Sequence, residues 1–264
     1  MGTIEVVALI LAGLMVGFIN TLAGGGSIIS LSLLMVLGLP PNVANGTNRI
    51  AIIIQNIMAT ASFRQQKVLV MPKSLYLGIP AVVGSVAGAL IAVELSEDLL
   101  RSAMGVIMLF MLVFILYNPK KWLNEDQAGS ARGISLKQVV IFFFIGMYGG
   151  FIQVGVGYLL LAALVVGAGF DLVKSNAAKV LVILMYLPFS LVVFLLNDDV
   201  NWSYGLVMTI GNVTGAFIAS RLAVKKGTAF IRYVIIAVIL LTAGHLFGLY
   251  DFQALFDQWI SRPG

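Results

Sequence analysis

Two cationic side chains occur within apolar stretches of this sequence, each about one helical turn after an asparagine. Asn45 precedes Arg49 by four residues, and Asn176 precedes Lys179 by three. Residues at these spacings share one face of a helix, so each pair presents an amide and a cation together. Such groups are suited to hydrogen-bonding and neutralising a small anion. The two pairs are therefore the predicted centre of a substrate-binding site.

Each cation also has a structural interpretation. Arg49 would be a positive flank if its turn lay at a membrane surface, and Lys179 would extend its stem toward an interface. The turn around Arg49 falls on the side that the topology makes periplasmic, where a positive flank is not expected. A charge inside a membrane segment costs at least about 2.5–3.5 kcal/mol and is usually functional. The substrate interpretation is favoured for Arg49, and both stay open for Lys179.

Glycine-rich breaks interrupt the apolar sequence once in each half. Gly24–Gly26 precede Ser27 in the first half, and Gly155–Gly157 form a weaker copy in the second. In hydrocarbon, backbone exposed by such breaks survives only where it is buried in protein or lines a cavity. Three consecutive glycines exceed what close helix packing requires. We therefore predict that their bare N–H groups cradle an oxyanion and that Ser27, as the N-cap of the next helix, adds its hydroxyl.

Single polar residues beside the breaks complete the candidate site. Asn20 and Gln153 each lie about one turn before a break, where they either line a cavity or bridge helices. Asp171 is interpreted as a helix cap, Lys174 as solvated, and the only histidine, His245, as a packed or interfacial residue. The predicted substrate-binding residues are Asn20, Gly24, Gly25, Gly26, Ser27, Asn45, Thr47, Asn48, Arg49, Gln153, Gly155, Gly157, Ser175, Asn176 and Lys179.

The composition is that of an integral membrane protein. Of the 264 residues, 60% are hydrophobic and only 10% are charged, whereas soluble domains carry roughly 25% charged residues. The net charge of +5 therefore reflects membrane topology and predicts no nucleic-acid partner. The sequence has no cysteine, which excludes disulfides and Cys-ligated metals. It also lacks HExxH, Walker A and GxSxG motifs, so we expect no enzyme, cofactor or metal site.

Apolar runs occupy most of the chain. A full crossing needs about 20 residues, within a range of about 17–25, so three of the runs are too short unless they are half-helices or steep crossings. The run at 49–63 reaches full length only if it begins at Asn42. The first run lacks a positive start and a cleavage site, and is interpreted as a retained helix. The runs lie at roughly 4–22, 27–39, 49–63, 69–93, 99–117, 139–154, 158–170, 180–196, 202–220 and 229–249.

The two halves resemble each other at a constant offset of 131 residues. Because the chain is so apolar, the number of identical residues at this offset is barely above chance. The evidence for a repeat is that uncommon residues and segment boundaries match at the same offset. Two-fold internal repeats are the basis of many transporters. The landmarks are Gly24 with Gly155, Gly26 with Gly157, Gly38 with Gly169, Asn45 with Asn176, Gly84 with Gly215 and Arg101 with Arg232.

Charged loops predict that the two halves insert in opposite orientations. The loop at 64–73 is basic and its counterpart at 197–201 is acidic, whereas the loop at 94–98 is acidic and its counterpart at 221–232 is basic. Loops rich in Lys and Arg face the cytoplasm. Both termini are therefore predicted to be periplasmic.

The predicted fold is an all-α integral membrane protein. It has two inverted-topology repeats of about five hydrophobic segments each, with broken or half-length helices at the repeat interface. Residues 1–117 form the first transmembrane repeat, 118–137 a cytoplasmic linker, 138–250 the second, inverted repeat and 251–264 a short interfacial C-terminal tail.

Four motifs resemble a known family. Gly17–Ser27 and Ala44–Arg49 look like the first repeat of the TauE/SafE family, and Gly149–Gly157 and Ser175–Lys179 resemble its second. The similarity covers nearly the whole chain and implies a membrane protein that exports sulfite or an organosulfonate such as sulfoacetate. The second repeat departs from the family pattern, since it has only two break glycines and carries Ala178-Lys179 in place of Gly-Thr.

Together these observations predict a secondary transporter that exports a small sulfur-containing anion across the bacterial inner membrane by alternating access. The substrate would lie between the two breaks, with the two buried cations balancing its charge. An anion channel that uses the same cations is the main alternative, and a membrane subunit without transport activity is another. The expected partners are the small anion and the lipid bilayer, and a homodimer is left open.

Overall fold

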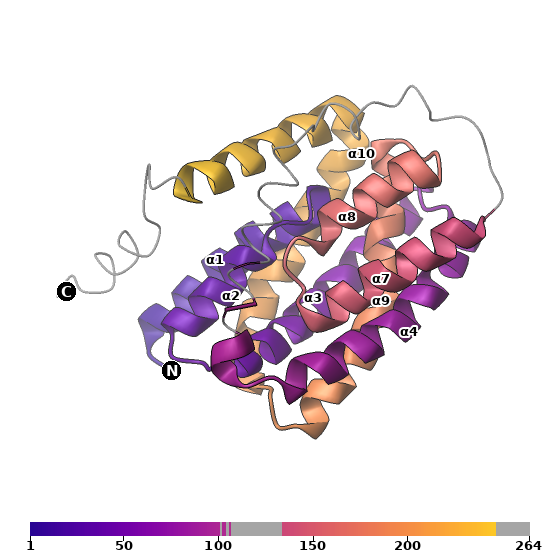
Figure 1. Cartoon of the computed structure of the whole chain (residues 1–264). Helices are drawn as coiled ribbons and strands as arrows, with labels where there is room; N and C mark the ends of the chain where they lie inside the picture. Colours follow the sequence, from indigo (N-terminus) through magenta and orange to yellow (C-terminus); the bar gives the residue numbers. More distant parts are fainter. Residues whose placement is uncertain (101, 104–105, 107–133, 247–264) are drawn as a thin grey trace.

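The computed structural model describes residues 1–100, 102–103, 106 and 134–246, with the side chains of 239–246 left out. In these ranges all regular structure is helical, and the helices gather into one bundle (Figure 1). Most of the predicted linker at 118–137 and the tail at 251–264 lie outside the described residues, as does the side chain of His245. The helices are α1 Thr3–Leu22, α2 Ser27–Val36, α3 Pro41–Gln65, α4 Met71–Glu94, α7 Leu136–Phe151, α8 Val156–Ala162, the π-helix Ala163–Gly167, α9 Leu172–Leu196 and α10 Trp202–Leu246.

Four of the described helices are long and apolar enough to cross a membrane. They are α1, α4, α9 and the Trp202–Val238 part of α10. The shorter apolar helices are α2, α7 and α8 with the π-helix that continues it. The fold is therefore an all-helical membrane protein that combines full spans with short helices, and the short helices flank the two glycine breaks.

The segment around Arg49, described above as a turn, is helical. Pro41–Gln65 forms one continuous helix of 25 residues, so no break lies at 40–49. Pro41 stands in the first turn, where its missing N–H is not needed. The helix begins one residue before Asn42 and places Arg49 about two turns inside it. The equivalent polar stretch of the second half likewise forms the first turns of α9.

Side chains cap the N-terminal ends of α7 and α9, whereas α2, α3, α4 and α8 have no side-chain cap. Asp171 caps α9, as predicted, by accepting a hydrogen bond from Lys174 N at 2.8 Å, and an ion pair of 3.0 Å holds the Lys174 ammonium beside it. The prediction for Ser27 is wrong, because Gly26 is the N-cap of α2 and no side chain caps this helix. Gly227 has a φ of 71° inside α10, and the helix changes direction there (Figure 1).

Glycines bring two pairs of helices together in the same way. Gly13 and Gly17 of α1 lie directly on the backbone of Met208 and Asn212 in α10. In α4, Gly84 and Gly88 lie on the backbone of α7. In both pairs the residue numbers rise together along the contact, so the paired helices run parallel. The absence of Cβ atoms allows the backbones to approach closely, as in other small-residue membrane interfaces.

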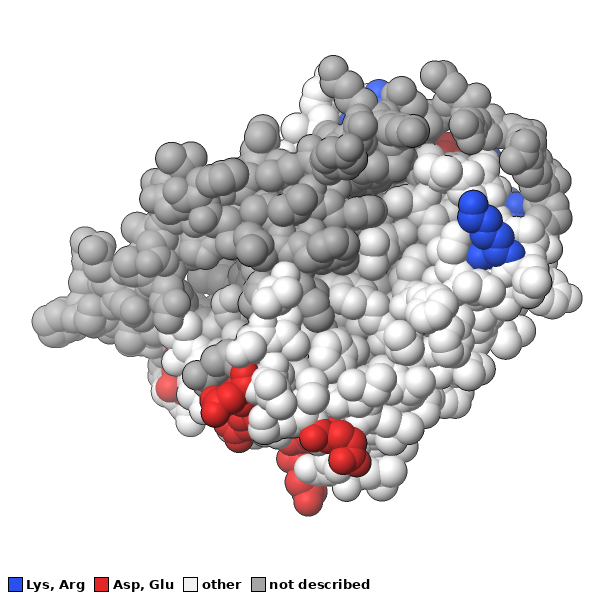
Figure 2. Space-filling view, in the orientation of Figure 1, with Lys and Arg blue, Asp and Glu red and all other residues white. Residues whose placement is uncertain are grey.

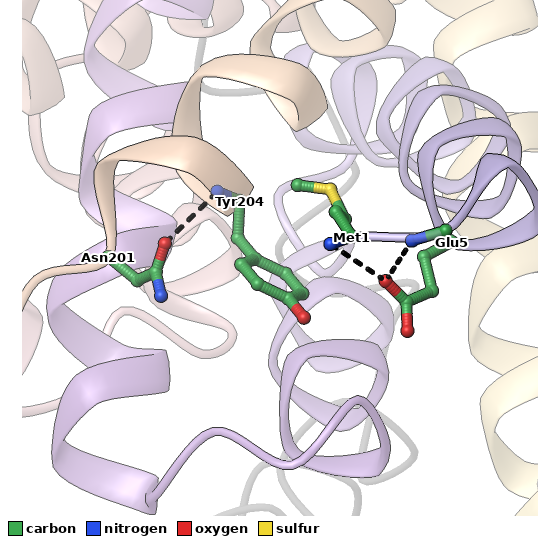
Figure 3. A network of polar contacts seen from close by, with 5 residues as sticks. Met1, Glu5, Asn201 and Tyr204 are labelled. Carbon is green, nitrogen blue, oxygen red and sulfur yellow. Dashed lines mark hydrogen bonds and ion pairs between the residues drawn. The ribbon is translucent and has the colours of Figure 1, made fainter.

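The starts of α1 and α10 lie at the same end of the molecule, as these contacts require. Asn201 Oδ1 accepts a hydrogen bond of 3.3 Å from Tyr204 N and caps α10. At the start of α1, Glu5 accepts from Gly2 N at 2.8 Å and pairs with the N-terminal ammonium of Met1 at 4.0 Å. Figure 3 shows both caps, with the Tyr204 ring between them.

Most charged side chains separate to opposite ends of the bundle. Figure 2 shows most of the visible Asp and Glu along the lower end and Lys and Arg toward the other, where an acidic group is also visible. Arg221 of α10 donates a hydrogen bond of 2.6 Å to Gln65 at the end of α3, so the basic loops of the two halves meet at one end. At the acidic end, Asp199 lies within electrostatic range of Glu97.

Candidate functional site

The two glycine breaks meet in the interior of the protein. Gly24 and Gly157 lie backbone to backbone, and a Cβ atom built on either would overlap the Cα atom of the other. Gly24 has a φ of 99° and Gly155 a φ of 70°, a left-handed conformation that glycine adopts without strain. The chain therefore bends at both breaks, and glycine at the crossing brings the two bends into contact.

A small polar cavity lies beside this crossing. Its volume of about 10 Å³ is close to the least that holds one buried water. The lining residues come from both halves of the chain, and five of the nine are amides or a hydroxyl. They are Asn20, Gly24, Ser27, Ile52, Gln55, Asn56, Gln153, Gly157 and Ile183.

Hydrogen bonds behind the cavity orient two glutamine amides. Tyr186 donates its hydroxyl hydrogen to Gln153 Oε1 at 2.9 Å, and Asn212 Nδ2 donates to Gln55 Oε1 at 3.1 Å. Each carbonyl oxygen is thereby occupied. Since no described atom accepts a hydrogen bond from either Nε2 group, both NH₂ groups remain as donors beside the cavity. One comes from each half of the chain.

Asn56 differs from the two glutamines, because its free group is a hydrogen-bond acceptor and not a donor. Its Nδ2 donates to Ile52 O, one turn earlier in α3, at 2.7 Å. Its Oδ1 is buried and has no hydrogen-bond partner among the described residues. Buried polar groups without partners are uncommon in native structures and require an explanation such as a bound water or ligand. Because Asn56 is one of the lining residues, its unpartnered oxygen lies close to the cavity and becomes available to a ligand when the cavity widens.

Arg49 is fully buried and bonds to the end of α7, a helix of the other half. Its guanidinium donates to Gly149 O at 3.2 Å and Gly150 O at 2.7 Å. It also donates to Ser190 Oγ at 2.9 Å and to Asn45 Oδ1 at 3.3 Å. The carbonyl groups at a helix C-terminus lack partners within the helix and carry partial negative charge. Arg49 thus caps α7.

Lys179 makes the reciprocal contact. Its ammonium donates to Asn20 O at 2.9 Å and Thr21 O at 3.0 Å, the last carbonyls of α1, and to Asn176 Oδ1 at 2.6 Å. An ammonium has three hydrogens, and three acceptors take them. The sequence correctly associates Asn45 with Arg49 and Asn176 with Lys179. It does not reveal that both cations bond to the backbone, and neither lines the cavity.

Most N–H groups of the first break are already engaged, contrary to expectation. Gly26 N donates to Asn20 Oδ1 at 2.8 Å, and Gly24 N donates to Ile19 O at 3.0 Å. Gly25 packs against the ring of Tyr158. Because Asn20 folds back over the break, the cavity receives its polar groups from side chains rather than from a cradle of bare amides.

The remaining predicted residues lie around the site without lining it. Thr47 accepts a hydrogen bond of 2.8 Å from Asn201 N at the start of α10. Ser175 bonds to Phe170 O at 3.3 Å. Asn48 is fully buried, and neither polar atom of its amide has a partner among the described residues. Gly155 forms the left-handed N-cap of α8.

Sequence reasoning missed three polar residues of the site. Gln55 and Asn56 line the cavity, and Asn212 orients Gln55 from behind. A signal was present, since Gln55 and Asn56 are two adjacent amides in the middle of the apolar run at 49–63. Ile52 and Ile183, which also line the cavity, are separated by the same offset of 131 residues as the glycine breaks.

Comparison with known proteins identifies the family. Residues 9–246 match the family described as sulfite exporter TauE/SafE. The probable membrane transporter protein YfcA of Escherichia coli (strain K12) is 30% identical over 243 residues, which cover 92% of this chain and 89% of the relative. A probable membrane transporter protein of Haemophilus influenzae is 28% identical over 233 residues, with coverages of 88% and 90%. No solved structure matches the chain. The chain therefore belongs to the TauE/SafE family of membrane transporters.

Proposed function

We propose that the protein is a secondary transporter that exports a small sulfur-containing anion, such as sulfite or the organosulfonate sulfoacetate, across the bacterial inner membrane. One observation carries the proposal. The polar cavity lies where the two glycine breaks cross, and both halves of the chain contribute to its lining. Transporters that work by alternating access bind their substrates at such junctions between repeats, beside broken helices. The family description supports a sulfur oxyanion as the cargo.

The proposal includes two halves inserted in opposite orientations. Helix directions support this arrangement: α1 runs parallel to the first part of α10, and α7 runs parallel to α4. Contacts of α3 with α10 at both ends, Thr47 with Asn201 and Gln65 with Arg221, make these two helices parallel as well. Since α4 turns back after α3, it runs opposite to α10. The equivalent helices α1 and α7 then point in opposite directions.

The electrostatics favour an anion. The cavity lining includes no carboxylate, while Arg49 and Lys179 lie behind it, each about one turn from a lining isoleucine of its own helix. We propose that these cations act through their field and through the helix ends that they hold. The membrane potential would drive the anion out of the cell, since an interior-negative potential is worth about 2.3 kcal/mol per charge per 100 mV. The basic end of the bundle would face the cytoplasm.

The small cavity supports a transporter rather than a channel. A space of about 10 Å³ holds a water molecule and not a sulfur oxyanion. Since the cavity is too small for the proposed cargo, substrate entry requires the halves to move. We propose that the structure represents a closed state between inward-open and outward-open forms.

Reconstitution into liposomes tests the proposal. Purified protein should exchange labelled sulfite or sulfoacetate across the membrane, with counterflow, which a channel does not give. Gln153→Leu removes one donor from the cavity and should reduce exchange at least tenfold. Thr214→Val is the matched control, because within the described residues Thr214 bonds to its own helix at Ile210 O, and the change should leave exchange unaffected. Absence of any exchange by the wild-type protein with this panel would contradict the proposed cargo.

A further inference from the structure

The hydrogen-bonding polarity of the cavity distinguishes between protonation states of its ligand. This inference rests on the proposed function and concerns the same site. Gln153 supplies a fixed donor. Tyr186 is fully buried, and its hydroxyl bonds to Gln153 Oε1. A buried hydroxyl needs an acceptor, so the amide oxygen of Gln153 stays toward Tyr186 and the NH₂ group is left for the cavity.

Asn56 supplies a fixed acceptor. The carbonyl of Ile52 accepts from the Nδ2 group of Asn56. A reversed amide would bring two oxygens face to face, so this orientation is held by the helix backbone itself. The remaining Oδ1 is buried and unpartnered in the described part of the chain. Ile52 lines the cavity one turn before Asn56, and the two residues share a face of α3.

A ligand that satisfies both groups needs oxygen atoms and one bound hydrogen. Its oxygens accept from the NH₂ groups of Gln55 and Gln153, and its hydrogen is donated to Asn56 Oδ1. A fully deprotonated dianion has only acceptors, so one of its oxygens would face the Asn56 oxygen without a hydrogen between them. An unpaired buried acceptor carries the full cost of its desolvation.

We infer that the cavity, once the halves have moved enough to admit a ligand, binds the singly protonated form of an oxyanion, with hydrogen sulfite preferred over sulfite, and that Asn56 recognises the proton. The acceptor comes from one half only. The position 131 residues after Asn56 is Leu187, which is buried and apolar. The proton is therefore recognised by α3, while each half contributes one amide donor.

Binding measured across a pH series tests this inference. The probes are sulfite, whose two forms interconvert near neutral pH, and methanesulfonate, a monoanion that carries no acidic hydrogen. For the wild-type protein, affinity for total sulfite should fall with rising pH in proportion to the hydrogen sulfite fraction. Methanesulfonate should bind independently of pH and about 10-fold to 100-fold more weakly than hydrogen sulfite, because it leaves Asn56 unpaired.

Two variants show whether Asn56 is responsible. Asn56→Leu should abolish the preference for hydrogen sulfite over methanesulfonate, and Asn56→Asp should move the binding of sulfite to lower pH. Thr60→Val, one turn further along α3 and outside the cavity lining, should behave like the wild type. Equal or tighter binding of the dianion by the wild type would overturn the inference and leave the transport proposal standing. Failure of the wild type to bind either probe at any pH would overturn both.

Discussion

Gly24 and Gly157 cross so closely that neither position has room for a Cβ atom. The crossing brings the glycine break of the first half against the glycine break of the second half, and the polar cavity lies beside it. Close contact between the two backbones leaves little room for added side-chain atoms, since protein interiors are packed as densely as crystals of small organic molecules. The geometry of the site therefore depends on this pair of glycines.

Substitution of the crossing glycines should destabilise the protein. Gly157→Ala introduces only a steric overlap, which typically costs about 1–3 kcal/mol. Gly24→Ala adds the strain of a left-handed residue, roughly a further 1–2 kcal/mol. Thermal unfolding of the purified variants measures both effects. Gly38→Ala is the control for strain alone, because Gly38 has a φ of 90° and open space around it. A Gly157→Ala protein as stable as the wild type would contradict the crossing.

Lys179→Met should be strongly destabilising. The substitution leaves Asn20 O and Thr21 O without their buried donor, and an unsatisfied buried group costs about 1–3 kcal/mol. Lys174→Met is the matched control, because Lys174 is exposed and pairs at the surface with Asp171, where an ion pair contributes about 0–1 kcal/mol. Equal unfolding temperatures for the two variants would show that Lys179 does not hold the end of α1.

Tyr186→Phe should weaken ligand binding more than it weakens the fold. Without the hydroxyl, Gln153 loses the partner that orients its amide, and a hydrogen bond of this kind is worth about 0.5–1.5 kcal/mol, or roughly 2-fold to 12-fold in affinity. Titration of sulfite or sulfoacetate onto the purified protein measures the loss. Tyr158→Phe also removes a buried hydroxyl, but not one that bonds to Gln153, and should bind like the wild type. A loss of the same size in both variants would argue against a positioning role.

Asp199 makes the stability depend on pH. Burial, and to a smaller extent the charges of Asp198 and Glu97, raises the pKa of this carboxyl above its ordinary value of 3.8, against the opposing hydrogen bond from Asn42. A raised pKa means that the folded state holds the proton more tightly than the unfolded state. Asp199 therefore contributes fully to the stability of the fold at pH values below its ordinary pKa. This contribution is lost as the pH rises through the raised pKa of the folded state.

Asp199→Asn should remove this dependence and stabilise the protein at neutral pH, because the amide oxygen still accepts from Asn42. Unfolding temperatures measured between pH 4 and 8, on the order of the range where carboxyls titrate, give the comparison. The control variant is Glu94→Gln, at an exposed carboxyl at the end of α4 that is not among the charges acting on Asp199. If the wild-type protein gains stability with rising pH and Asp199→Asn does not, the pKa shift of Asp199 has the opposite sign and the prediction is wrong.

Local patterns in the sequence predict much of this architecture. Apolar runs and low charge identify the membrane helices, and the two glycine breaks mark the places where those helices stop. The positions of Asn20 and Gln153 before the breaks left open whether they line a cavity or bridge helices, and the structure places both in the cavity lining. These features are visible because glycine, charge and apolar length act through the local backbone.

The roles of the cations could not be predicted in the same way. Their acceptors are backbone carbonyls of helices at least 100 residues away, and carbonyl groups carry no sequence signature. Gln55 and Asn56 were missed for a related reason. An amide in an apolar helix faces a cavity, a neighbour or lipid according to how the helix is rotated, and that rotation depends on packing against α9 and α10.

The central claim is that one cavity between the two halves opens in turn to each side of the membrane. Because the chain has no cysteine, Ile52→Cys and Ile183→Cys each provide a single thiol in the cavity lining. We predict that a membrane-impermeant thiol reagent modifies both positions from either side of reconstituted vesicles, and that sulfoacetate slows the reaction at both. Modification of the two thiols from one side only, or at rates that sulfoacetate does not change, would contradict the account.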